Sequence, residues 1–78
     1  MPTICYIDGY RFFFFSNEGL EPMHIHIDKA GSLAKFWLND LSLASNYGFN
    51  SAELNKLRKL VETNHEFFVV KWNEYFNR

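Results

Sequence analysis

Two histidines lie two residues apart in a short alternating stretch, His24-Ile25-His26-Ile27-Asp28. Side chains two apart in a strand point to the same side, so an extended backbone places both imidazoles and the Asp28 carboxylate on one face. Imidazole titrates near neutral pH, so one ring can accept a proton from an attacking hydroxyl while the other donates one to a leaving oxygen. The spacing therefore permits acid–base catalysis on a phosphodiester by His24 and His26.

Four other side chains would complete such a site if the fold brings them to the same face. Arg11 and Lys35 would stabilise the negative charge that develops in the reaction. Trp37 and Tyr47 would stack a base, as recognition of single-stranded RNA often requires. These parts describe a ribonuclease that needs no metal and no other cofactor.

The same stretch also permits a divalent metal site with His24, His26 and Asp28 as ligands. Imidazole nitrogens and carboxylate oxygens bind such metals, and the two rings lie about 6–7 Å apart along a strand. A third interpretation involves no site, because histidines that alternate with isoleucines are also the polar half of an amphipathic strand. The sequence leaves all three interpretations open.

The histidine stretch belongs to a predicted hairpin of strands 23–28 and 33–38, joined by a loop over 29–32. Its apolar half (Met23, Ile25 and Ile27) faces a core, and its polar half faces away. The register of a four-residue loop predicts three cross-strand pairs on the polar side: Asp28 with Leu33, His26 with Lys35, and His24 with Trp37.

A second hairpin precedes this one, with strands over 3–7 and 10–15 around Asp8-Gly9. That dipeptide favours a two-residue type I′ turn, whose central residues need positive φ. The run Phe12–Phe15 makes strand 10–15 central in the sheet and covered on both faces. A short strand over 41–45 is also possible, and with it the predicted sheet has five strands instead of four.

Two helices follow the strands. Asn50 is a predicted N-cap with Glu53 three residues on, which begins a helix over 51–62. A second capping sequence at Thr63 predicts a break and a new helix over 64–76, with one uninterrupted helix from Asn50 as the alternative. Phe67 and Val70 fall on the side of the second helix that does not face the sheet, so they either pack on the first helix or form the predicted interface with a partner.

Composition limits the class of protein. At 78 residues the chain is a single domain over 1–78, and 47% of its residues are hydrophobic, so we expect some apolar surface and a homodimer or a small cognate protein partner. The net charge of −1 provides no basic field for double-stranded DNA, although a local RNA site stays open. The sequence has no membrane-spanning run and no secretory segment, which predicts a cytoplasmic protein.

Several blocks of the sequence resemble a small bacterial and phage family, domain of unknown function family 4160. They include the Gly9–Glu18 run, the His24-x-His26 pair, Ala34-Lys35-Phe36-Trp37 and the Trp72-x-Glu74-Tyr75-Phe76 ending. The resemblance implies no established activity. It implies a short protein often encoded beside another small protein, which by analogy suggests one component of a toxin–antitoxin-like pair. In this family Pro is more usual at the position of Met23.

These observations together predict an α+β fold, with a four- to five-stranded, mostly antiparallel sheet and two C-terminal helices packed on one face. For function, they favour a protein that acts through a partner. The metal-independent ribonuclease and the histidine-based metal-binding protein are the alternatives.

Overall fold

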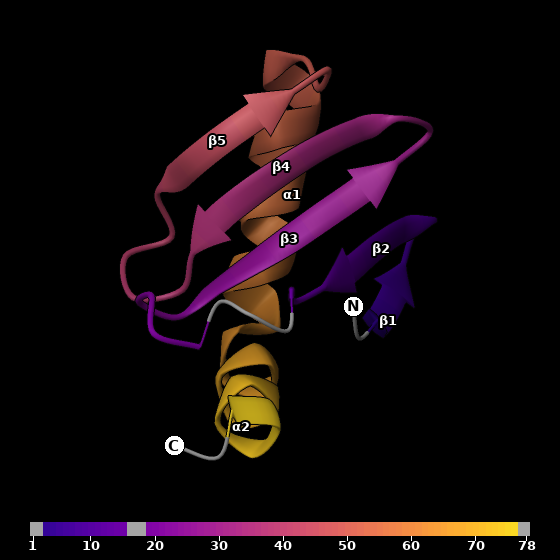
Figure 1. Cartoon of the computed structure of the whole chain (residues 1–78). Coiled ribbons are helices and arrows are strands. Elements are labelled where there is room, and N and C mark those ends of the chain that lie inside the picture. Colours follow the sequence, from indigo (N-terminus) through magenta and orange to yellow (C-terminus); the bar gives the residue numbers. More distant parts are fainter. Residues whose placement is uncertain (1–2, 16–18, 77–78) are drawn as a thin grey trace.

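The computed structural model describes residues 3–15 and 19–76 of the chain. Five strands precede two helices (Figure 1): β1 (Thr3–Ile7), β2 (Tyr10–Phe13), β3 (His24–Lys29), β4 (Ser32–Trp37), β5 (Leu43–Tyr47), α1 (Ser51–Thr63) and α2 (His65–Phe76). The strands form one antiparallel sheet in the order of the chain, β1-β2-β3-β4-β5. The predicted α+β class is confirmed.

Two tight turns fix the register of the sheet. Asp8 and Gly9 have φ angles of 53° and 82°, as a type I′ turn requires, and Ile7 pairs with Tyr10. The β3–β4 loop is shorter than predicted, because Lys29 pairs with Ser32 and only two residues with positive φ lie between them. The register is nevertheless the predicted one: Asp28 with Leu33, His26 with Lys35, and His24 with Trp37.

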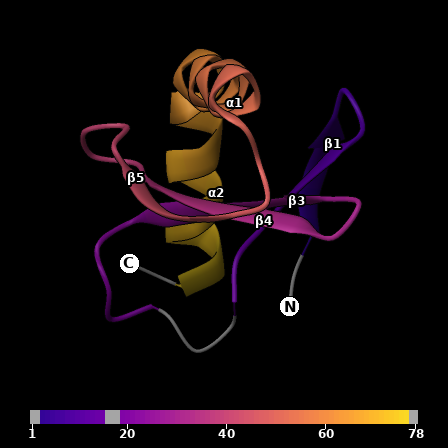
Figure 2. The same ribbon diagram turned by 90° about the horizontal axis from the view of Figure 1, so that it is seen from above.

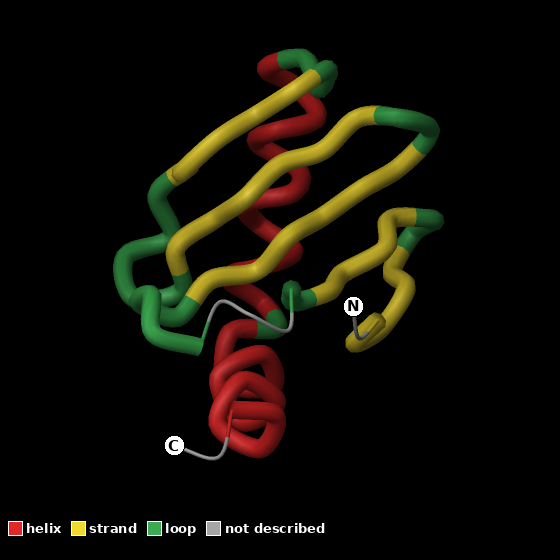
Figure 3. Tube along the Cα trace, in the orientation of Figure 1, coloured by secondary structure: helices red, strands yellow, loops and turns green. Residues whose placement is uncertain are grey.

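Every strand except β1 differs in its bounds from the prediction. β3 and β4 are each shifted by one residue toward their shared turn, and β2 and β5 differ by two residues. β2 ends at Phe13 rather than at residue 15, and the long connection to β3 begins there (Figure 3). β5 begins at Leu43 rather than at residue 41, because the Asp40 carboxylate accepts hydrogen bonds from the Ser42 N–H (3.0 Å) and hydroxyl (2.7 Å). Leu41 has a φ of 63° in this turn, so the strand cannot start earlier.

The helices begin and break close to where the sequence predicts. The Asn50 side chain accepts a hydrogen bond from the Glu53 N–H (2.8 Å) at the start of α1. α1 ends at Thr63, and the Asn64 side chain donates to the Leu60 carbonyl (2.8 Å) at the junction with α2. None of the described helices has the length and the hydropathy needed to cross a membrane.

The main core lies between the sheet and the helices. Figure 2 shows α1 on one side of the sheet, whereas α2 runs past the sheet and reaches its other side. The residues of this core are fully or almost fully buried: Tyr10, Phe12, Phe14, Ile25, Ile27, Ala34, Phe36, Leu38, Phe49, Leu57, Val61, Phe68 and Trp72. Side chains on the other face of the sheet therefore meet α2 only at the end of the sheet that it passes.

Gly48, which follows β5, is expected to tolerate alanine poorly. Its φ is 95°, and an added Cβ would lie 2.5 Å from the Ser32 hydroxyl oxygen and 3.3 Å from the Ser32 Cα. Gly31 is a matched control, because its φ is 87° and an added Cβ would meet nothing within 4 Å. Urea unfolding should show a loss of about 1–2 kcal/mol for Gly31→Ala from the backbone alone. Gly48→Ala should lose about 1–3 kcal/mol more from overpacking, and equal losses would contradict the close approach.

Candidate functional site

The histidine pair lies on the sheet face opposite α1, as the alternation predicts, but it is not in solvent. His24 is 0% exposed and His26 is 6% exposed. The two imidazoles are therefore not solvated side chains, although the strand alternates as the sequence predicts. Aromatic side chains from β2, β4 and α2 cover the two imidazoles.

Two phenylalanines enclose His26. The Phe13 ring stacks on the imidazole with centroids 5.3 Å apart and an angle of 22° between the planes. Phe15, just beyond the end of β2, meets the same imidazole edge-on at 4.6 Å. Phe13 is the cross-strand partner of His26, so the register of β2 on β3 places the stack.

Two tryptophans and a backbone carbonyl surround His24. Trp37, its cross-strand partner on β4, lies at 5.7 Å between ring centroids, and Trp72 of α2 lies at 4.9 Å. The imidazole Nδ1 donates a hydrogen bond to the Pro22 carbonyl (2.8 Å). That bond places a proton on Nδ1, so Nε2 carries the lone pair when the ring is neutral.

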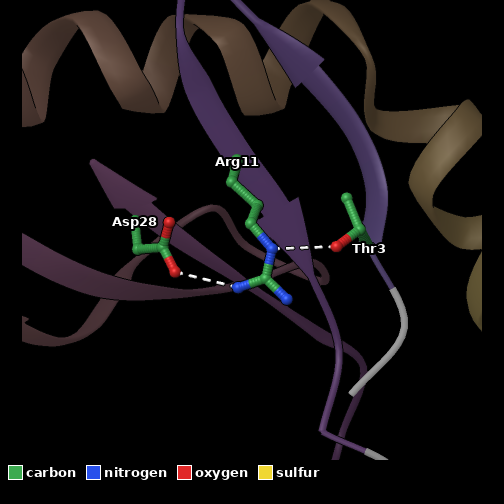
Figure 4. A network of polar contacts seen from close by, with 3 residues as sticks. All are labelled: Thr3, Arg11 and Asp28. Carbon is green, nitrogen blue, oxygen red and sulfur yellow. Dashed lines mark hydrogen bonds and ion pairs between the residues drawn. The ribbon is translucent and has the colours of Figure 1, made fainter. Parts of the chain in front are cut away.

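Arg11 flanks this aromatic cluster and is fully engaged there. Its guanidinium pairs with the Asp28 carboxylate at 2.9 Å, and its Nε donates to the Thr3 hydroxyl at 2.8 Å (Figure 4). The guanidinium carbon also lies 4.2 Å from the centre of the Phe13 ring. Phe13 thus contacts both the guanidinium and the His26 imidazole.

Lys35 lies on β4, across from His26, and its charge is paired in the same way as that of Arg11. Its amine pairs with the Glu21 carboxylate at 2.8 Å and lies 4.5 Å from the Trp37 ring centre. Both predicted catalytic cations thus lie beside the histidine face. Each is neutralised by a carboxylate and packed on an aromatic ring rather than directed at a reacting group.

Other predicted site residues are not brought together. Tyr47 is paired with Leu33 at one end of β4, whereas Trp37 is at the other end, about 13 Å away along the strand. The two rings cannot stack one base at that separation. Tyr47 is 75% exposed, so it is available for a contact of a different kind.

The described residues do not assemble the predicted metal site. Asp28, the third predicted ligand, pairs with Arg11. Residues 3–15 and 19–76 contain no group of three histidine, cysteine or acidic side chains arranged to hold a metal ion.

A hollow of about 390 Å³ lies on the histidine face, on the side of the β3–β4 turn. Its lining consists of Phe13, Phe15, Asp28, Gly31, Ser32 and Leu33. Neither imidazole belongs to this lining, so a molecule in the hollow would touch the edge of the aromatic cluster and not the histidines.

Cys5 is not a nucleophile candidate. It pairs with Phe12 across β1 and β2, and burial raises the pKa of its thiol. A raised pKa keeps the thiol protonated at neutral pH, and the thiolate is the reactive form.

The predicted interface residues lie where the helix pattern places them. Phe67 is 42% exposed and Val70 is 52% exposed, while Phe68 and Trp72 of the same helix are buried. The role of Trp72 is the main feature that the sequence did not reveal. The helical period predicts that it faces the sheet, but only the path of α2 past the end of the sheet brings it to His24.

The model of the family described as Domain of unknown function (DUF4160) matches residues 9–73 of this chain. The chain belongs to this family. The matched range contains the histidine face, the Arg11–Asp28 pair, and Phe67 and Val70 of α2. No curated protein and no solved structure matches the chain.

Removing the imidazole of His24 is expected to destabilise the fold. His24→Ala leaves a cavity between the two tryptophans and leaves the Pro22 carbonyl without this donor, so urea unfolding should show a loss of about 2–4 kcal/mol. Arg58→Ala, an exposed position on α1, should change stability by less than about 0.5 kcal/mol. If His24→Ala is as stable as the Arg58 variant, the imidazole is not a core side chain.

Proposed function

We propose that this protein acts as a cytoplasmic binding protein for a small protein partner, as one component of a toxin–antitoxin-like pair. The proposed binding surface is the outward side of α2 around Phe67 and Val70, which we name the α2 patch. The observation that carries the proposal is the exposure of these two side chains, 42% and 52%, in a chain whose His24 and His26 are buried. Exposed apolar groups gathered on one side of a helix are typical of a docking surface.

The border of the α2 patch supports this interpretation. Lys71 pairs with Glu74 at 3.5 Å, and its amine lies 5.7 Å from the centre of the Phe67 ring. An apolar centre with a charged border is the usual arrangement in a protein–protein interface.

The outward side of α1 provides a contrast within the same molecule. Its exposed positions include Lys56, Arg58, Lys59 and Glu62, and its apolar Leu57 and Val61 are buried. The two helices have similar lengths and both border the main core, but only α2 places a phenylalanine and a valine in solvent. This difference favours a partner at α2.

Charge supports a protein partner over a nucleic acid. Lysines and arginines number eight against nine acidic residues, and Arg11, Lys35 and Lys71 are each paired with a carboxylate. Binding to phosphates depends mainly on free cations that displace counterions.

Burial of the histidines supports a binding role over catalysis. With His24 at 0% and His26 at 6% exposure, an attacking hydroxyl or a leaving oxygen cannot reach the imidazoles in this conformation. The metal-independent ribonuclease and the histidine-based metal protein remain predictions from the sequence.

The proposal predicts that Phe67→Ser/Val70→Ser weakens a complex while the fold survives. The protein should be co-expressed with the small protein encoded beside its gene, and affinity should be measured by calorimetry. Loss of both apolar contacts should raise the dissociation constant at least about tenfold, because buried apolar anchors dominate binding energy. Arg58→Ser/Lys59→Ser on α1 is the matched control and should bind like the wild type.

Equal affinity of the α2 and α1 variants would contradict the α2 patch. The toxin–antitoxin-like role needs a separate readout, growth during inducible expression of each protein alone and of both together. The pair is supported if one protein arrests growth and the other relieves the arrest. Phe67→Ser/Val70→Ser should then either abolish the arrest or prevent its relief, depending on which of the two proteins this chain is. Normal growth when either protein is expressed alone and when both are expressed together would contradict that role.

A further inference from the structure

We infer that the outer edge of β5 pairs with β5 of a second copy of this chain, in a symmetric dimer that continues the sheet across both molecules. This inference is independent of the α2 patch, because β5 is at one edge of the sheet and the patch is on a helix. It rests on the position, the composition and the exposure of β5.

Position is the first observation. β5 is the last strand in the sheet order and pairs with β4 on one side. Figures 1 and 3 show its other side at the boundary of the molecule, where none of the described segments runs alongside it. An edge strand presents alternate backbone N–H and C=O groups that can accept another strand.

Composition is the second observation. Residues 41–52 contain no charged side chain and no proline, and this is the longest such run in a chain with 22% charged residues. Natural proteins usually protect a free edge with lysine, proline or an inward-pointing charge. β5 has none of these, although a bulge between its pairs with Lys35 and Phe36 interrupts its first residues. The regular part, Ser45 to Tyr47, is therefore the segment left open to pairing.

Exposure is the third observation. Leu43 is 43% exposed and Tyr47 is 75% exposed, and they lie at the two ends of the strand. Antiparallel pairing about Ser45 brings Leu43 of each copy level with Tyr47 of the other. The bulge turns Leu43 to the face of Phe36 and Tyr47 to the face of Leu33, so each side chain covers the new strand pair on its own face of the sheet. This arrangement fits a second copy of the chain, because β5 has no charged side chain that would repel the same side chain of the other copy.

Symmetry also favours a second copy over another protein. A twofold axis at the middle of the strand closes the β5 edge in both molecules at once and leaves no further β5 edge. The contact covers few residues, so the dimer is expected to be weak and to depend on protein concentration.

Sedimentation equilibrium across a range of concentrations tests the inference with three variants. The wild type should dimerise as concentration rises. Ser45→Lys should weaken the dimer at least tenfold, because two lysines meet near the twofold axis and Lys35 stands beside each of them. Ser45→Thr, which keeps the strand neutral, should dimerise like the wild type.

Tyr6→Lys is the matched control at the opposite edge of the sheet. Tyr6 is 67% exposed on β1 and pairs with Arg11, so this lysine also stands opposite a cation, but away from β5. It should leave the dimer unchanged, as should Phe67→Ser/Val70→Ser. Wild type that is monomeric at every concentration, or Ser45→Lys that dimerises like the wild type, would overturn the inference.

Amide hydrogen exchange of the wild type gives a test that does not depend on a variant folding. Amides of residues 43–47 should exchange more slowly as concentration rises, while those of β1 should not change. Exchange in β5 that is independent of concentration, in a sample that does dimerise, would place the interface elsewhere and overturn the inference.

Discussion

The contact of Trp72 with His24 is the interaction on which the two faces of the sheet depend. Trp72 is 2% exposed and lies among Phe14 (5.2 Å), Phe76 (4.2 Å) and His24 (4.9 Å). One side chain thus belongs to the main core and also closes the end of the histidine face. Because α2 passes the end of the sheet rather than lying flat on it, a chain of this size can cover aromatic groups on both faces (Figure 2).

Burial of the histidine face explains why its charged neighbours are paired. A cation beside a buried aromatic cluster is stabilised when a carboxylate neutralises it and a ring packs against it. Arg11 with Asp28, and Lys35 with Glu21, have this arrangement over Phe13 and Trp37. The residues that looked like a catalytic set in the sequence therefore form a second, smaller core with a charged border. The two surfaces that we propose for recognition lie elsewhere, on α2 and at the β5 edge.

Local signals in the sequence predicted the fold well. Asp8-Gly9 determined the first hairpin, and alternation along residues 23–28 determined which side chains share a face with His24. The Asn50 cap determined the start of α1. The phenylalanine run predicted cover on both faces of strand 10–15, and Phe13 lies on His26 as part of that cover. Burial of His24 was not predictable, because it depends on the direction of α2 after Asn64. Alternation tells which side of a strand a residue occupies, but not what covers that side.

Chemical modification of the histidines with diethyl pyrocarbonate, followed by mass spectrometry of the intact and digested protein, tests the central claim most directly. In native protein His24 and His26 should react far more slowly than a free imidazole, and both should react at the free rate after unfolding in urea. Rapid reaction of either residue in the folded protein would mean that the imidazoles are open to reagents. The histidine face would then be a site rather than a core.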